Sequence, residues 1–177
     1  MEPNEGISTA RNEYMTSHRQ LHYHLVWATR FREPWITQDR EGFMYAVLGR
    51  KVQDLGGFVH AVNGMPDHVH LVADIPPTIA VAQFVGQVKG ASSRRYRELV
   101  DAFQWQAGYS AFTVSPRQLP HAIAYVTRQK QHHANNTAIR QIEPPPDASR
   151  DEEDSSRDDS AREDSSRDDS SDKVSRG

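Results

Sequence analysis

The chain has 177 residues, contains no cysteine and carries a formal net charge of −3. The lack of cysteine excludes a disulfide framework and thiolate chemistry. The N-terminal segment lacks an apolar signal-peptide core, and no apolar run reaches the roughly 20 residues of a membrane span, so we expect a cytoplasmic protein without membrane segments.

Charge and composition divide the chain into two parts. Residues 1–137 hold 14 Lys/Arg against 11 Asp/Glu, a net charge of +3, and all nine histidines, whereas residues 138–177 carry −6. The second part repeats the octet EDSSRDDS and has few apolar residues, so it cannot bury enough surface to offset its ordering entropy. We therefore predict a folded domain over residues 18–137 between disordered segments at 1–17 and 138–177.

Strands and helices alternate in the predicted domain. Period-two alternation and flanking turn residues predict strands at 20–29, 58–64, 110–115 and from His68 onward. Apolar stripes predict helices that begin near Thr37, near Thr78 and at Ser115-Pro116, the first ending at Gly56-Gly57. The order β-α-β-β-α-β-α predicts an α+β, ferredoxin-like (split β-α-β) antiparallel sheet, with helices on one face plus a C-terminal helix.

Two segments place a pair of histidines on one face of a strand. In MPDHVHLVADIPP (65–77), alternation directs His68 and His70 to the same side, where two imidazoles can share a cation. His22 and His24 have the same spacing in the first strand, so spacing alone does not choose between the pairs. Asp67, just before His68, is either a turn residue or an acceptor that orients an imidazole.

The predicted C-terminal helix carries a polar stripe beside its apolar one. Tyr125 and Gln129 are four residues apart and therefore stack on one flank, well away from the stripe that contains Ile123 and Val126. A tyrosine phenol can attack phosphorus, and a glutamine carbonyl one turn away can reach a metal ion. The alternative is a surface tyrosine on an amphipathic helix.

A basic segment predicts contact with nucleic acid. KGASSRRYR (89–97) combines cations, hydroxyls and small residues, which are the groups that contact phosphates; the candidates are Lys89, Ser92, Ser93, Arg94, Arg95 and Arg97. Trp105, Tyr109 and Phe112 either stack on unpaired bases or belong to the core. Because the domain has a net charge of only +3, local clustering must supply the attractive field.

Five segments, taken in order, resemble the small single-tyrosine HUH (His-hydrophobic-His) transposases of prokaryotic insertion sequences and the related REP-associated tyrosine transposases. They cover roughly residues 20–135 and read YHLVWATRFR, NGMPDHVHLVADIPP, VGQVKGASSRRYR, WQAGYSAFTVSP and AYVTRQKQHH. In that family the His-hydrophobic-His motif follows a Met-Pro-Asp turn, which selects the pair at His68 and His70. The stretch YVTRQ maps the family's nucleophile onto Tyr125, together with Gln129.

The resemblance implies a DNA strand transferase that acts on single-stranded DNA carrying hairpins at the ends of an element. A divalent metal, Mg²⁺ or Mn²⁺, held by His68, His70 and Gln129 would polarise the scissile phosphate. Tyr125 would attack it, leaving a 5′-phosphotyrosine and a free 3′-hydroxyl. Members of the family are homodimers whose tyrosine helix can act on the partner's metal site, and the sequence leaves open whether the site of this chain forms in cis or in trans. The acidic C-terminal segment lies outside the family pattern.

Other functions also fit parts of the sequence. A ferredoxin-like sheet is widely used by non-catalytic modules that bind single-stranded nucleic acid. A metal-dependent hydrolase could use the same histidines to activate water, and would still cleave after Tyr125→Phe. A domesticated relative acting on chromosomal repeat hairpins would share the transposase chemistry and differ only in its DNA target.

Overall fold

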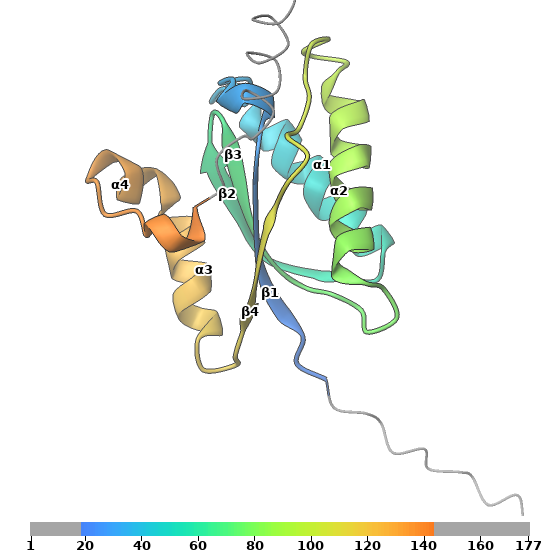
Figure 1. The fold of residues 1–177 in the computed structure, drawn as a ribbon, viewed down its shortest axis with the longest axis vertical. Helices are drawn as coiled ribbons and strands as arrows, with labels where there is room; N and C mark the ends of the chain where they lie inside the picture. The colour runs from blue at the N-terminus through green and yellow to red at the C-terminus, as the bar shows by residue number, and fades with distance from the viewer. Residues whose placement is uncertain (1–18, 144–177) are drawn as a thin grey trace, which may run out of the picture.

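The computed structural model describes residues 19–143 and contains one four-stranded sheet (Figure 1). Its strands are β1 (His22–Ala28), β2 (Phe58–Met65), β3 (His68–Asp74) and β4 (Ser110–Val114). Their spatial order is β2-β3-β1-β4, and every neighbouring pair is antiparallel. Strands β1 and β2, which are joined through a helix, have β3 inserted between them in the sheet, and β3 and β4 likewise have β1 between them. This is the split β-α-β arrangement, so the predicted α+β, ferredoxin-like fold is confirmed.

Helices cover both faces of the sheet (Figure 1). One face carries α1 (Glu41–Asp54) and α2 (Val81–Tyr96), whereas α3 (Leu119–Thr127) and α4 (Gln129–Ala134) lie on the other. Two short 3₁₀ helices, η1 (Arg30–Arg32) and η2 (Arg140–Ile142), complete the elements of the described part. Within residues 19–143, no helix has both the length and the apolar character that crossing a bilayer requires.

The hydrophobic core lies between the sheet and the α1/α2 layer. Leu25 and Trp27 of β1 and Leu71 of β3 are fully buried there, and they meet apolar side chains of both helices. The helix contributions are Met44, Leu48, Val52, Phe84, Val85 and Val88. Because side chains alternate along a strand, the intervening residues of β1 and β3 face α3 instead.

The helices begin three or four residues later than the sequence predicts. Thr37 and Ser115 do not cap helices with their side chains; their carbonyl oxygens accept the amides of Glu41 (2.8 Å) and Leu119 (3.0 Å) in preceding turns. Helix α2 likewise starts at Val81 without a side-chain cap. The end of α1 agrees with the prediction, since Gly56 has a φ of 77°, a conformation that favours glycine.

The predicted C-terminal helix is interrupted at Arg128, which separates α3 from α4. Next to the break, the Thr127 hydroxyl donates to the Ile123 carbonyl oxygen (2.8 Å), and the Asn63 amide donates to the Thr127 carbonyl oxygen (2.9 Å). Such side-chain bonds compete with the helix's own hydrogen bonds. The interruption changes the direction of the chain just before Gln129.

The predicted domain end at residue 137 falls inside the described part of the chain. Residues 138–143 continue from α4 and include η2. The disorder predicted for residues 1–17 lies outside the described residues, as does that predicted for the tail from residue 144 onward. The six residues beyond 137 matter because Glu143 reaches the histidines of β3.

Candidate active site

Strand β3 presents His68 and His70 on the sheet face that α3 covers. In the register with β1, His68 lies opposite Ala28 and His70 opposite Val26. Both imidazoles are buried, with 1% and 0% of their surface exposed. Strand β2 approaches this end of β3 so closely that a Cβ atom at Gly64 would lie 2.2 Å from the His68 carbonyl oxygen, which explains the glycine.

Asp67 is both a turn residue and an orienting acceptor. Its backbone carbonyl accepts the Thr29 amide (2.8 Å), and its Oδ1 lies 2.7 Å from His68 Nδ1. Arg32 Nε holds the other carboxylate oxygen at 2.8 Å. Because Nδ1 of His68 is engaged in this way, its Nε2 points toward the site. This is the arrangement that commonly fixes the tautomer of a metal-binding histidine.

The second histidine pair, His22 and His24, is divided between two places. His24 packs on His70, with 2.9 Å between His24 Nε2 and His70 Nδ1 and the rings stacked 5.2 Å apart. Burial, reinforced by the charge of His70, lowers the pKa of His24 to about 3, so its imidazole is neutral at physiological pH. His22 lies further along the same face, against Asp74.

Glu143, which lies outside the predicted domain of residues 18–137, is at the centre of the site. The Glu143 Oε1 atom accepts hydrogen bonds from the Tyr125 hydroxyl (2.9 Å) and from Gln129 Nε2 (3.0 Å). Its Oε2 atom lies 3.2 Å from His68 Nε2 and 3.5 Å from His70 Nε2. A single carboxylate therefore joins the predicted nucleophile to all three predicted metal ligands.

No spacing pattern identifies Glu143 in advance. It is a lone glutamate directly before a run of three prolines, which is typical of a linker. The nearest signal lies in the residues that precede it, since Ile139 and Ile142 are the last large apolar residues before the acidic repeats. The Ile139 amide donates to the Tyr125 hydroxyl oxygen (3.0 Å), so this segment contacts the site in two places.

Gln129 is fully buried and faces the histidines. Its Nε2 atom lies 2.9 Å from His70 Nε2 and 2.9 Å from His133 Nε2. His133, which the sequence analysis did not single out as a site residue, also lies 3.3 Å from Glu143 Oε2. His132 stacks on the Tyr125 ring at 4.8 Å. Tyr125 and Gln129 therefore contact the same carboxylate, although the break at Arg128 separates their helices.

Contacts within the site and burial shift the pKa values of Glu143, His68 and Tyr125. Burial opposes ionisation of Glu143, but the imidazoles of His68 and His70 beside its Oε2 atom outweigh this effect and hold the pKa of the carboxyl well below its usual range. Burial likewise disfavours the charged form of His68, yet its hydrogen bond to Asp67 and the nearby Glu143 carboxylate raise the pKa of this imidazole. Burial raises the pKa of the Tyr125 phenol. In this state the phenol is a neutral donor to a carboxylate.

The donor atoms around Glu143 fit a divalent cation. His68 Nε2, Gln129 Oε1 and Glu143 Oε2 are buried without a hydrogen-bond partner, which is costly unless another group satisfies them. The ligand atoms of His68, His70 and Glu143 all lie within 4.8 Å of one another. Rotation of the Gln129 amide would exchange its nitrogen and oxygen and turn the oxygen toward the same point.

The predicted DNA-contacting residues are on α2 or, for Arg97, directly after it, across the sheet from the histidines (Figure 1). Several already bind protein atoms: Lys89 Nζ donates to the carbonyl oxygens of residues 106, 107 and 108, and Arg97 Nε donates to that of Phe103. Arg95 pairs with Glu98, and buried Ser92 accepts from the Trp105 indole. The exposed side chain of Arg94 is on the same helix.

A hollow of about 420 Å³ lies beside this part of α2. Its lining includes Lys89, Ser93, Arg97, Trp105 and Tyr109. Trp105 also packs edge-on against Trp27, at 5.9 Å between centroids, and Tyr109 packs against the core. Phe112 instead lies on the histidine face, 6.0 Å from the His24 ring. The three predicted aromatic residues therefore do not form one stacking platform.

The sequence profile of the family described as "Transposase IS200 like" matches residues 17–129, more than half of the chain. The chain belongs to the IS200-like transposase family. The match includes both histidines, Tyr125 and Gln129, and it ends before Glu143. The predicted resemblance to transposases of insertion sequences is therefore confirmed.

Individual transposases agree with the family assignment. The ISDra2 transposase TnpA of Deinococcus radiodurans is 30% identical over 118 residues, which cover 62% of this chain and 84% of that protein. The transposase for insertion sequence element IS200 of Salmonella typhimurium is 27% identical over 71 residues, covering 40% of this chain and 47% of that protein. The longer alignment extends over most of a complete transposase.

Two solved structures share the fold. A crystal structure of a Deinococcus radiodurans protein assigned as a transposase superimposes with a TM-score of 0.53 and 25% identity, covering 77% of this chain and 97% of that chain. A REP-associated tyrosine transposase bound to a REP hairpin superimposes with a TM-score of 0.52 and 13% identity, covering 67% and 74%. At 13% identity, the second likeness shows the fold alone.

Proposed function

We propose that this IS200-like transposase cleaves and rejoins single-stranded DNA through a covalent bond to Tyr125. The observation that carries the proposal is the meeting of Tyr125, Gln129, His68 and His70 around the Glu143 carboxylate. A module that only bound nucleic acid would have no need for a phenol beside two buried imidazoles. The family supports transposition as the biological role.

The proposed cleavage step is a transesterification. The Tyr125 oxygen forms a bond to the scissile phosphorus while the bond from phosphorus to the 3′ oxygen breaks, leaving a 5′-phosphotyrosine. The phenol proton is released to water while Glu143 Oε1 holds the hydroxyl in place through its hydrogen bond, and water protonates the departing 3′ oxygen. Attack by a 3′-hydroxyl reverses the step on a new partner, so the energy of the phosphodiester bond is retained and ATP is not required.

The metal ligands in this proposal are His68, His70 and Gln129, with Glu143 added by its position in the structure. A divalent cation at this site supplies Lewis-acid stabilisation of the negative charge that develops on the phosphoryl oxygens. Two imidazole nitrogens beside two oxygen donors suit Mn²⁺ better than Mg²⁺, which prefers oxygen ligands. Asp67 orients His68, and His24 orients His70, in each case through the Nδ1 atom of the ring.

We infer that the site is assembled within one chain. The Tyr125 and His70 rings of the same chain are 6.1 Å apart, and both contact the same glutamate. We retain the homodimer as a proposal, but it is not needed to bring these groups together. We propose DNA hairpins as the substrate; a REP hairpin is bound by a protein of the same fold.

The DNA-contacting surface that we propose begins at the hollow beside α2. Lys89, Ser93 and Arg97 line it together with two aromatic rings, which suits a phosphate backbone with unpaired bases beside it. Arg94, Arg95 and Ser92 complete the proposed set, although Ser92 would act by holding Trp105 rather than by touching DNA.

The test is covalent capture of labelled single-stranded hairpin DNA in Mn²⁺. The native protein is expected to give a protein–DNA band that resists denaturation, and Tyr125→Phe and EDTA are each expected to abolish it. His121→Ala, which removes an exposed histidine of α3, is the matched control and should retain the band. Cleavage that survives Tyr125→Phe would support a water-activating hydrolase instead, and binding without any cleavage would support a non-catalytic module.

A further inference from the structure

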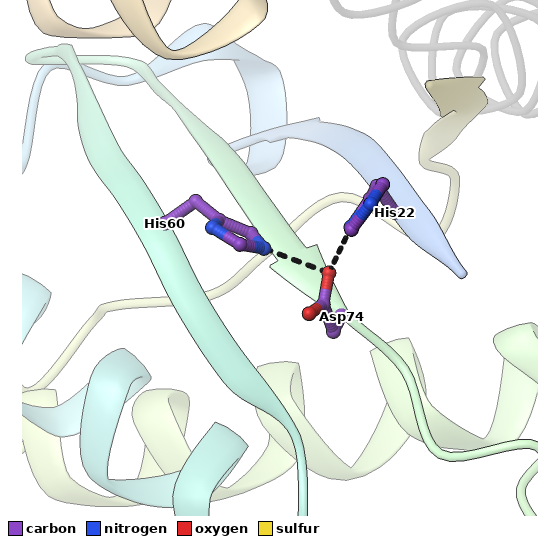
Figure 2. Close-up of side chains that lie close together, drawn as sticks. All are labelled: His22, His60 and Asp74. Atoms are coloured by element: carbon purple, nitrogen blue, oxygen red, sulfur yellow. Dashed lines mark hydrogen bonds and ion pairs between the residues drawn. The ribbon is translucent and has the colours of Figure 1, made fainter. Parts of the chain in front are cut away.

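A second cluster of metal-binding side chains lies at the other end of the histidine-lined face (Figure 2). It contains His22 at the start of β1, His60 in β2 and Asp74 at the end of β3. Asp74 lies six positions after His68 in β3, which corresponds to ~20 Å at ~3.3 Å per residue. The cluster is therefore separate from the site around Tyr125.

The strand register and one β-bulge bring these three side chains together. Asp74 lies directly opposite His22 in the β1–β3 pair. In the β2–β3 pair, the register shifts between Val59 and Ala61, so His60 is an extra residue in a bulge. A bulge redirects a side chain, and here it turns the His60 ring toward Asp74 (Figure 2).

The donor atoms converge on a single carboxylate oxygen. Asp74 Oδ1 is 2.7 Å from His60 Nε2 and is also in contact with His22 Nδ1 (Figure 2). The two rings meet edge to face, with their centroids 5.4 Å apart. The side chains of His22 and His60 are 11% and 15% exposed and that of Asp74 is 37% exposed, so the cluster is shielded yet open to solvent on one side.

We propose that His22, His60 and Asp74 form a second metal site, for Zn²⁺ or a similar transition-metal ion. Two imidazole nitrogens and one carboxylate oxygen are a donor set that zinc uses, with water completing a tetrahedron. The open side at Asp74 leaves room for that water. The donors require no large rearrangement, because all three ligand atoms already lie within 4.8 Å of one another.

The site acts as a clamp rather than as a catalyst. Strands β1 and β2 are not neighbours, since β3 separates them, and an ion held from both would tie three strands together where β1 begins. The neighbouring Phe58 ring, 5.0 Å from that of His60, offers no acid, base or nucleophile. An ion bound only to the folded state stabilises it by mass action, and a saturating concentration should raise the Tm by roughly 5–10 °C.

The test uses the full chain with His68→Ala and His70→Ala, which removes the site around Tyr125. After treatment with a chelator, this double variant is titrated with Zn²⁺ by calorimetry. We expect it to bind one ion per chain, to show the visible spectrum of tetrahedral Co²⁺ when Co²⁺ is substituted, and to gain thermal stability. Because the background lacks the proposed catalytic ligands, the result does not depend on the proposed transposition chemistry.

Two further substitutions in that background decide the proposal. His60→Gln retains an amide donor toward Asp74, and Asp74→Asn retains the shape of the side chain, so both keep the local hydrogen bonding. Each should weaken Zn²⁺ binding at least about tenfold and remove the rise in Tm, whereas His121→Ala should change neither. Zinc binding that is absent in the double variant, or unchanged by His60→Gln and Asp74→Asn, would overturn the proposal.

Discussion

The two faces of the sheet differ in what they bury, although the same strands build both. Toward α1 and α2, Leu25, Trp27 and Leu71 are fully buried in an apolar core. Toward α3, the alternate residues His24 and His70 are buried as polar groups that bind one another. Neighbouring positions of one strand therefore differ in role: the apolar positions form the core, and we propose that the histidine positions serve the chemistry.

Burial alone does not identify the core of this protein. His70 and Leu71 are both 0% exposed, yet only Leu71 belongs to the continuous apolar cluster. His70 has polar neighbours at both ring nitrogens, His24 at Nδ1 and both Gln129 and Glu143 at Nε2. A buried polar group with this many partners is costly to build, which makes it a candidate for function.

His70→Ala should have the largest effect. It removes a proposed metal ligand, so we expect hairpin cleavage to fall by about 10²-fold or more, whereas hairpin binding changes only a few-fold. Cleavage and binding are measured on the same labelled oligonucleotide. If binding were lost together with cleavage, His70 would have a structural role, and the two faces of the sheet would not differ in function.

Leu71→Ala, one residue further along β3, should have the opposite effect. We expect the free energy of unfolding to fall by about 2–5 kcal/mol, because a fully buried leucine is replaced by a cavity. Chemical denaturation measures this loss. Cleavage per folded molecule should remain near the native value at low temperature, and a specific loss of cleavage in folded Leu71→Ala would contradict the division between the faces.

A pair of truncations tests the contribution of Glu143. A chain ending at residue 143 retains the glutamate, and we expect its metal affinity and cleavage to be unchanged. A chain ending at residue 141 lacks Glu143, so metal affinity should fall at least about tenfold, because one of the proposed ligands is removed. Full-length Glu143→Gln should weaken metal binding similarly, while Glu33→Gln, an exposed glutamate, should not.

Equal metal affinities in the two truncated chains would exclude Glu143 from the metal site. The charge pattern of the sequence suggests that residues 142–177 are only a tail, in which case removing them would leave cleavage unchanged. Because Glu143 contacts Tyr125 and His68, we expect metal affinity to depend on whether the truncated chain ends before or after this glutamate.

Arg94→Ala should have the smallest effect. This exposed side chain lies on α2, away from the histidine face, so we expect hairpin affinity to fall a few-fold and the salt dependence of binding to weaken by about one counterion. Arg19→Ala, an exposed arginine just before β1, is the control. An unchanged affinity for Arg94→Ala would remove this arginine from the proposed DNA surface.

Local patterns in the sequence were sufficient for much of the fold. Alternation in β1 and β3 and the apolar stripes of α1 and α2 predicted the elements, and their order predicted the ferredoxin-like sheet. Helix starts were wrong by three or four residues, because the residues expected as caps form turns instead. The break at Arg128 could not be predicted, since it involves Asn63, which is distant in sequence.

For the candidate site, the sequence indicated the residues that belong to motifs and missed those brought in by folding. His68 and His70 follow a recognisable turn, and the spacing of Tyr125 and Gln129 suggested a shared face. Glu143 comes from a segment with the composition of a linker, so only its contacts in three dimensions identify it. The grouping of His60 with His22 depends on a bulge that no local pattern predicts.

The most direct test of the central claim is to map the covalent bond to a residue. Trypsin cleavage after Arg117 and Arg128 releases residues 118–128, a peptide whose only tyrosine is Tyr125. After reaction with hairpin DNA in Mn²⁺ and nuclease digestion, mass spectrometry should find a nucleotide attached to this peptide. An adduct on any other peptide, or cleaved DNA without an adduct, would contradict nucleophilic attack by Tyr125.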